Sequence, residues 1–155
     1  MISFSRAMNY GFVVLSPGEV PAGGPAVAPQ RIVLVVEDEG PIRSILSRGL
    51  QKGNYTVLTA ENGQVALGIL KERGNQIGAL LTDMDMPVMN GIALITAIRA
   101  GQTPEFTGGI LAMSGRMGDH QPTLESLGIL PQNMLLKPFT LSVILAAVES
   151  VFQNP

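Results

Sequence analysis

Five short, mostly apolar runs constrain the fold of this chain more than any other feature. They cover residues 32–36, 55–59, 78–82, 110–113 and 134–136. The first run, IVLVV, has no polar residue, which is typical of a strand buried on both faces of a parallel sheet. Between the runs, apolar side chains recur three or four residues apart, as they do in amphipathic helices. This alternation predicts an α/β fold in which crossover helices join parallel strands.

Residues that begin or end helices divide the sequence between these runs. Pro41 suits the first turn of a helix, where its missing N–H is not needed, and Gly53 with Asn54 ends that helix. Asn62 can cap a second helix, because its side chain can accept a hydrogen bond from a backbone N–H. Further helices are expected at residues 90–100, at 122–127, where the pattern is weaker, and from residue 140 onward. We therefore expect a doubly wound five-stranded parallel sheet with five helices, in three layers α/β/α.

Residues 1–30 differ in composition from the rest of the chain. They hold only two charged side chains, four prolines and a Gly-Gly pair, and such segments are usually extended and poorly ordered. We interpret residues 1–30 as a flexible Pro/Gly-rich N-terminal extension or linker and residues 31–153 as the folded domain. A secretory signal is the competing interpretation, but the apolar stretch at 11–15 is shorter than an ordinary signal core.

The composition excludes several classes of function. The chain has no Cys and a single His, so cysteine catalysis, thiolate metal sites and sites with two imidazoles are excluded. A formal net charge of -2 argues against a nucleic-acid-binding surface or an anionic-membrane binder. No apolar run is long enough to span a bilayer. We therefore expect a cytoplasmic protein that binds neither nucleic acid nor membrane.

Polar side chains gather at the ends of the predicted strands. Glu37 and Asp38 follow the first strand, Asp83 the third, Ser114 the fourth and Lys137 the fifth. Because ligand sites of doubly wound folds lie beyond the carboxyl ends of the strands, we expect all five side chains at one edge of the sheet. Three carboxylates would repel one another there, and Mg²⁺ would remove the repulsion while leaving room for phosphate oxygens. A carboxylate can attack phosphorus, and Lys137 and Ser114 could contact the phosphoryl oxygens, so the set favours phosphoryl transfer.

Four segments carry a resemblance to a known family. They are VLVVEDE at 33–39, LLTDMDMPVMNG at 80–91, ILAMSG at 110–115 and LLKPFT at 135–140. In this order they resemble the receiver domain of bacterial two-component response regulators, such as the chemotaxis response regulator, over about residues 31–153. The resemblance implies the flavodoxin-like strand order 2-1-3-4-5, which the spacing of the segments does not itself give.

The resemblance also implies a role for each residue at the strand ends. Asp83 would be the phosphoacceptor, Ser114 would hydrogen-bond the phosphoryl group and Lys137 would pair with it. The Mg²⁺ site would comprise Asp38, which binds directly, Glu37, which acts mostly through water, Asp83 and the backbone carbonyl of Asp85. The peptide between Lys137 and Pro138 would be cis, as is common in the family.

The implied activity is signalling by phosphoryl transfer. A sensor histidine kinase or a histidine phosphotransfer protein would supply the phosphoryl group from a phosphohistidine, and the aspartyl phosphate would hydrolyse slowly by self-catalysis. Phosphorylation would switch the conformation of a surface that docks a downstream protein target. We expect a single-domain regulator or the C-terminal receiver of a hybrid kinase, and in either case a signalling module instead of an enzyme.

Three features depart from the usual family pattern. Glu37 replaces the commoner Asp, a frequent variant that leaves activity in place. Met134 stands where many members have a Tyr or Phe that rotates during switching, so an aromatic switch is in doubt. Arg116 and Asp85 occupy two variable positions that tune phosphate lifetime in the family, in a direction that the sequence does not give.

Other interpretations stay open at this point. The motif Asp83-Met84-Asp85 resembles the D-x-D nucleophile motif of haloacid-dehalogenase-type phosphatases, although the acidic pair should then follow the nucleophile in sequence. A flavodoxin-like cofactor module would need a phosphate-binding loop after the first strand, where the acidic run stands instead. An inactive receiver that only dimerises is a further alternative. His120, in a loop-like context, is interpreted as an exposed residue and not as a phosphodonor.

Overall fold

The computed structural model describes residues 5–7, 12–14 and 31–153, and the chain divides into two units, residues 1–30 and 31–155. In the first unit, β1 (Ser5–Ala7) pairs antiparallel with β2 (Phe12–Val14). The other residues of the expected N-terminal extension lie outside the described residues, so its interpretation as a flexible linker stays a prediction.

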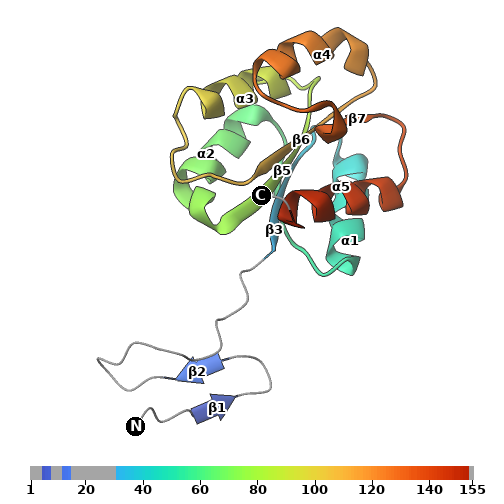
Figure 1. The fold of residues 1–155 in the computed structure, drawn as a ribbon. Helices are drawn as coiled ribbons and strands as arrows, with labels where there is room; N and C mark the ends of the chain where they lie inside the picture. The colour runs from blue at the N-terminus through green and yellow to red at the C-terminus, as the bar shows by residue number, and fades with distance from the viewer. Residues whose placement is uncertain (1–4, 8–11, 15–30, 154–155) are drawn as a thin grey trace. The chain divides into compact units, whose positions relative to one another are not determined.

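Five parallel strands form the sheet of the second unit (Figure 1). They are β3 (Ile32–Val36), β4 (Thr56–Ala60), β5 (Ile77–Asp83), β6 (Gly109–Ser114) and β7 (Met134–Leu136). Their order across the sheet is β4-β3-β5-β6-β7. Numbered within this unit, that is the predicted order 2-1-3-4-5, which is confirmed.

Five helices cover the two faces of this sheet. They are α1 (Gly40–Lys52), α2 (Gly63–Arg73), α3 (Gly91–Arg99), α4 (Met117–Ser126) and α5 (Leu141–Gln153), with short 3-10 turns η2 (Gly74–Gln76) and η3 (Pro131–Asn133). Helices α1 and α5 lie on one face and α2, α3 and α4 on the other (Figure 1), so the predicted three layers are confirmed. Within the described part of the chain, no helix is long and apolar enough to cross a membrane.

The central strand β3 shows why its sequence contains no polar residue. All five of its side chains are buried. Ile32, Leu34 and Val36 belong to the core on the side of α2, α3 and α4. Val33 and Val35 belong to the core on the side of α1 and α5. Because the side chains of a strand alternate between faces, a strand covered on both sides must be apolar throughout.

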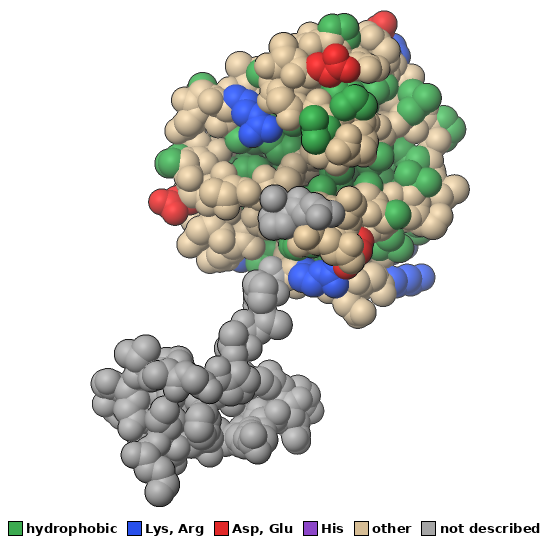
Figure 2. Space-filling view, viewed as in Figure 1, with side chains coloured by type: hydrophobic (Ala, Val, Ile, Leu, Met, Phe, Trp, Pro, Cys, Tyr) green, Lys and Arg blue, Asp and Glu red, His purple; other side chains and the backbone are tan. Residues whose placement is uncertain are grey.

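Apolar side chains also reach the surface of this unit. Figure 2 shows several apolar patches on one face, with few charged side chains among them. The large exposed apolar residues are Ile45, Val65, Val88, Leu130, Leu136, Leu141 and Val143. Single exposed apolar residues are ordinary, so only those that line a common groove carry an argument below.

The helix expected at residues 122–127 is longer than predicted. Helix α4 begins at Met117, and Pro122 lies inside it and not at its start. Pro122 is the sixth residue of α4, so it lies beyond the first turn and removes the backbone donor that would bond to the carbonyl of Gly118. Only Met117 and Leu124 of this helix are buried, and this sparse apolar pattern made the helix hard to recognise from sequence. The five predicted strands of the parallel sheet agree with the observed strands to within one residue at each end.

A polar cluster connects Arg31, which directly precedes β3, with Tyr55 and with Glu149 of α5. The Arg31 guanidinium lies 4.3 Å from the centre of the Tyr55 ring, and its Nη2 donates to the Tyr55 hydroxyl at 2.6 Å. Glu149 of α5 accepts hydrogen bonds from both Arg31 and Tyr55. The cluster therefore links three segments that are distant in sequence.

Titration of Tyr55 tests this cluster. Burial, and then the hydrogen bond to Glu149, raise the pKa of Tyr55 to about 12. The folded state favours the neutral phenol, so this stabilisation is present below the ordinary pKa of 10.0 and is lost as the pH rises through about 12. The variant Tyr10→Phe leaves Tyr55 as the only tyrosine. We expect its tyrosinate absorbance to rise with a midpoint of about 12, with the fold followed by circular dichroism in the same samples. A midpoint near 10 in protein that is still folded would contradict the cluster.

Candidate functional site

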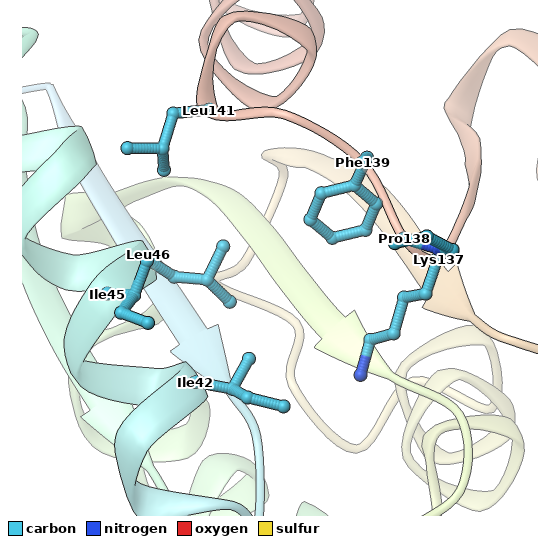
Figure 3. A pocket seen from close by; sticks show the side chains of 7 residues that line it. All are labelled: Ile42, Ile45, Leu46, Lys137, Pro138, Phe139 and Leu141. Carbon is cyan, nitrogen blue, oxygen red and sulfur yellow. The ribbon is translucent and has the colours of Figure 1, made fainter.

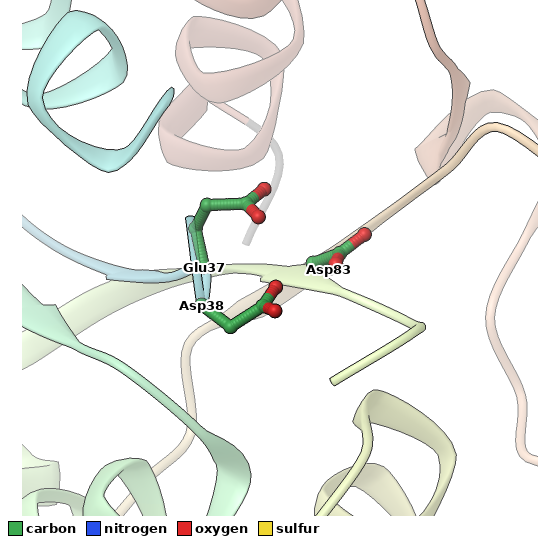
Figure 4. A group of neighbouring side chains, drawn as sticks. All are labelled: Glu37, Asp38 and Asp83. Atoms are coloured by element: carbon green, nitrogen blue, oxygen red, sulfur yellow. The ribbon is translucent and has the colours of Figure 1, made fainter. Parts of the chain in front are cut away.

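Three carboxylates meet at the carboxyl edge of the sheet (Figure 4). Glu37 and Asp38 directly follow β3, and Asp83 is the last residue of β5, which pairs with β3. One oxygen from each carboxylate lies within 4.8 Å of the others. We call Glu37, Asp38 and Asp83 the acidic cluster. Its oxygens could together hold a hard cation.

Lys137 is the cation that contacts this cluster. Its Nζ lies 2.9 Å from Oε2 of Glu37 and 3.1 Å from Oδ1 of Asp83. Lys137 directly follows β7, and its backbone N–H donates to the carbonyl of Ser114 at the end of β6. The Lys137–Pro138 peptide is cis. Strands β3, β5 and β7 thus each deliver one member of this contact.

One ammonium does not compensate the buried carboxylates. Glu37 is fully buried and Asp83 is 5% exposed. Burial raises the pKa of Glu37 and of Asp83 above their ordinary values, although the hydrogen bonds from Lys137 act in the opposite direction. Burial alone would lower the pKa of Lys137, but its hydrogen bond to Glu37 and the charge of Asp83 raise it overall. Lys137 is therefore held in its charged form, and when the three carboxylates of the cluster are ionised they outnumber this one ammonium.

Arg43 holds the backbone that carries the acidic pair. Its Nη1 donates to the carbonyl of Glu37 at 2.7 Å and to the carbonyl of Asp38 at 3.3 Å. Arg43 lies in α1, one turn beyond its start. Sequence reasoning missed this residue. The available signal was an arginine in the first turns of the helix that follows the acidic run.

Gly91 lets α3 begin directly against the end of β5. A Cβ at this position would lie 2.4 Å from the carbonyl oxygen of Asp83 and 2.3 Å from Cε of Met84. The backbone N–H of Gly91 also donates to the carbonyl of Met84. The Asn90 side chain caps the helix by accepting from the N–H of Ala93. A glycine is thus needed for the close approach that fixes the loop after Asp83.

Ser114 is held by hydrogen bonds to the other side of the site. It ends β6 and is fully buried. Its Oγ donates to Oδ2 of Asp85 at 3.1 Å and accepts from the backbone N–H of Arg116 at 2.9 Å. The other Asp85 oxygen, Oδ1, accepts from Nη2 of Arg116 at 2.9 Å and lies 3.1 Å from Nε2 of His120. Burial alone would raise the pKa of Asp85, but the hydrogen bonds from Arg116, Ser114 and His120 lower it overall.

The position of His120 differs from the sequence interpretation. The sequence suggested an exposed residue in a loop, but His120 lies in α4 and its side chain is only 19% exposed. It contacts Asp85, which is 35 residues earlier in the chain. Met134, at the position of the usual aromatic switch residue, begins β7 and packs against the core on the side of α2, α3 and α4.

An apolar groove opens beside the acidic cluster (Figure 3). It has a volume of about 370 Å³ and lies between α1 and the segment that enters α5. Its lining residues are Ile42, Ile45, Leu46, Lys137, Pro138, Phe139 and Leu141. Lys137 lines the groove and also contacts Glu37 and Asp83, so the groove and the cluster share a side chain.

Comparisons with known proteins identify the class of this domain. The sequence profile of the response regulator receiver domain matches residues 33–149. A probable chemotaxis protein CheY of Rhizobium etli is 29% identical over 128 residues, which are 82% of this chain and 96% of that protein. The chemotaxis response regulator CheY4 of Vibrio cholerae has a similar structure, with a TM-score of 0.69, 28% identity, and coverage of 79% of this chain and 98% of that one.

The chain therefore belongs to the response regulator receiver domain family, the phosphoaccepting modules of two-component signalling. The transcriptional regulatory protein PrrA of Mycobacterium tuberculosis is 31% identical over 122 residues, which are 79% of this chain. The chain spans 50% of the length of that regulator. Nothing in these comparisons supports the haloacid-dehalogenase-type alternative. In the structure, moreover, the second Asp of the D-x-D motif, Asp85, is bound to Ser114, Arg116 and His120.

Replacement of Lys137 tests the charge balance of the cluster. Lys137→Met leaves Glu37 and Asp83 without their ammonium, so we expect the free energy of unfolding at pH 7 to fall by about 3 kcal/mol. The raised pKa values of both carboxylates mean that stability is retained below their ordinary pKa values of 4.5 and 3.8 and is lost as the pH rises through the raised folded values. The loss should therefore shrink as the pH is lowered from 7 toward 5, in urea unfolding without added divalent ions.

The matched control for this experiment is Lys71→Met, on the exposed surface of α2. It should change the free energy of unfolding little and equally at both pH values. A loss in Lys137→Met that is the same at pH 7 and pH 5 would contradict the proposed charge imbalance.

Proposed function

We propose that Asp83 accepts a phosphoryl group from a histidine kinase or from a histidine phosphotransfer protein, with Mg²⁺ bound at the acidic cluster. The observation that supports this proposal is that a single ammonium, Lys137, is shared by two buried carboxylates, Glu37 and Asp83, so the carboxylates outnumber the ammonium whenever both are ionised. Three carboxylate oxygens within 4.8 Å of one another fit a hard divalent cation. The carbonyl of Asp85 is the proposed additional ligand.

In the proposed reaction, a carboxylate oxygen of Asp83 attacks the phosphorus of a phosphohistidine. The new O–P bond forms as the N–P bond breaks, and the imidazole leaves with the electron pair of that bond. Lys137 already lies 3.1 Å from Asp83 and can pair with an oxygen of the transferred group. Mg²⁺, when bound, would supply positive charge to the carboxylates and the phosphoryl oxygens. The same residues would support slow hydrolysis of the aspartyl phosphate by water.

Ser114 is proposed to complete the site after transfer. Its hydroxyl would donate to a phosphoryl oxygen and its movement would shift the end of β6 toward Asp83. Met134 offers no ring for an aromatic switch, so we propose that the signal to a downstream protein passes through the β6–α4 connection and not through an aromatic rotation.

The context of the domain is proposed on the same grounds. Matches include a chemotaxis protein of which the chain covers 96% and the sensor kinase CckA of Brucella abortus, of which it covers 12%. These two kinds of relative support either a separate regulator or the receiver of a hybrid kinase. We further propose that residues 1–30 are an extension or linker to a receiver at 31–153, and that the domain works in the cytoplasm.

Phosphorylation by acetyl phosphate tests the acceptor. With Mg²⁺, we expect the intact mass of the wild-type protein to rise by a single phosphoryl group, and Asp83→Asn to show no gain. The matched control is Asp119→Asn, an exposed carboxylate in α4, which should gain the group as the wild type does. A phosphoryl gain in Asp83→Asn would overturn the assignment. So would the lack of any phosphoryl gain in wild-type protein that binds Mg²⁺ and is presented with a phosphorylated kinase.

We also propose that the apolar groove receives the phosphodonor protein. The groove shares Lys137 with the acidic cluster, so a protein seated in it would lie next to Asp83. Ile45 lines the groove and is 56% exposed, which leaves its side chain available for contact. A small donor such as acetyl phosphate has no need of this surface.

Two substitutions of equally exposed residues test the groove. We compare transfer from a kinase that phosphorylates the wild type with phosphorylation by acetyl phosphate. Ile45→Glu should slow transfer from the kinase by about tenfold more than it slows the acetyl phosphate reaction, because it buries a charge at the interface. Leu130→Glu alters a residue that is 54% exposed and does not line the groove. It should leave the ratio of the two rates unchanged. Equal ratios for Ile45→Glu and wild type would contradict docking at the groove.

A further inference from the structure

The side chain of Asp85 has contacts that its proposed role as a backbone ligand does not explain. Its Oδ2 accepts from the Ser114 hydroxyl, and its Oδ1 contacts Nη2 of Arg116 and Nε2 of His120. We call these four residues, Asp85, Ser114, Arg116 and His120, the Asp85 latch. The latch joins the loop after β5 to the end of β6 and to the start of α4.

Both hydrogen-bonding functions of the Ser114 hydroxyl are occupied within the latch. A hydroxyl group has a single proton to donate, and that of Ser114 goes to Asp85 at 3.1 Å. Its oxygen accepts from the N–H of Arg116 at 2.9 Å. Ser114 is fully buried, so water does not compete for these bonds. The hydroxyl cannot donate to a phosphoryl oxygen until it leaves Asp85.

Arg116 and His120 hold the acceptor in place. The Arg116 side chain is 67% exposed, so its ion pair with Asp85 is weak by itself. The His120 side chain is largely covered and meets the same oxygen from the first turns of α4, whereas Arg116 directly precedes this helix. Together they orient the Asp85 carboxylate so that its second oxygen faces Ser114.

From these contacts we propose that Asp85 is a positioning residue that restrains Ser114 in the unphosphorylated state. Phosphorylation of Asp83 then draws Ser114 away from Asp85, so the phosphoryl group and the Asp85 carboxylate compete for one hydroxyl proton. This inference rests on the proposed phosphorylation of Asp83. According to this inference, the Asp85 side chain disfavours the phosphorylated state, because it holds the Ser114 hydroxyl away from the phosphoryl group.

Charge repulsion is the rival explanation for any such effect. Asp85 is an anion near the proposed phosphoryl position, so its removal could favour phosphorylation without any involvement of Ser114. The two explanations differ in whether the effect of Asp85 depends on the Ser114 hydroxyl. A double-mutant cycle measures that dependence.

The experiment is calorimetric titration with beryllofluoride and Mg²⁺, a mimic of the phosphoryl group. It compares wild type, Asp85→Ala, Ser114→Ala and the double variant. We expect Asp85→Ala to bind about tenfold more tightly than wild type, because release of a hydrogen bond to a charged group has about this effect. In the Ser114→Ala background, Asp85→Ala should cause no gain. Asp85→Asn, which keeps one acceptor oxygen for Ser114 but loses the charge, should gain clearly less than Asp85→Ala.

The contrary results are equally definite. A tenfold gain that persists without the Ser114 hydroxyl, or that appears in full in Asp85→Asn, would show repulsion and overturn the latch. Absence of any gain in Asp85→Ala would overturn it as well. If the wild type itself binds no beryllofluoride, the proposed phosphorylation fails and this inference fails with it. If the wild type binds beryllofluoride but the effect of Asp85→Ala does not depend on Ser114, only the latch is overturned and the proposed phosphorylation stands.

Hydrogen exchange tests the latch without any phosphoryl mimic. The N–H of Arg116 donates to the Ser114 oxygen, which Asp85 in turn holds. We expect Asp85→Ala to speed exchange of the Arg116 amide severalfold, whereas Glu125→Ala, an exposed residue in the last turn of α4, should not. Unchanged exchange in Asp85→Ala would show that Asp85 does not restrain Ser114 and would overturn the proposal.

Discussion

The site depends on a single ammonium group that is shared by two buried carboxylates. Lys137 contacts both Glu37 and Asp83, and Glu37 is entirely buried. An unpaired buried charge is strongly unfavourable, so the position of Lys137 is fixed by two partners at once. The pairing remains incomplete, because three carboxylates meet one ammonium. This excess of carboxylates supports the proposed cation site at this edge of the sheet, and a bound cation would in turn attract a phosphoryl group.

The fold supplies this arrangement through strand order. Placing β3 beside β5 brings the residues after β3 next to Asp83, although these segments are far apart in sequence. The β6–β7 pair then brings Ser114 and Lys137 to the same edge. Both faces of the sheet are covered by helices, so strand ends are where polar side chains can converge. Arg43 and Gly91 fix the two loops that carry the carboxylates.

Much of this could be predicted because local sequence pattern and strand position carry the information. The apolar run 32–36 gave a strand covered on both faces, and the strand ends gave the residues that now lie together. What could not be predicted depends on contacts between distant segments. The pairing of Asp85 with His120 spans 35 residues and leaves no periodic signal. The clamp from Arg43 is made to backbone carbonyls, which no side-chain pattern reports.

The start of α4 illustrates the same limit in a different way. Proline favours the first turn of a helix, so Pro122 was the reasonable start on local grounds. The helix instead begins at Met117, which is buried in the core. Tertiary packing of one methionine outweighed the local preference. That shift moved His120 from an expected loop into the helix that faces Asp85, and so concealed the latch from sequence reasoning.

The most direct test of the account is calorimetric titration of Mg²⁺ at pH 7 into wild type, Asp38→Asn and Glu37→Gln. The excess negative charge predicts a single site on the wild type, with affinity at least about tenfold weaker in each variant, because each loses a carboxylate charge from the cluster. It also predicts that the wild-type affinity falls as the pH is lowered, because the raised pKa values of Glu37 and Asp83 let protons compete with the cation. Failure of the wild type to bind Mg²⁺, or equal affinity in all three proteins, would contradict the central claim.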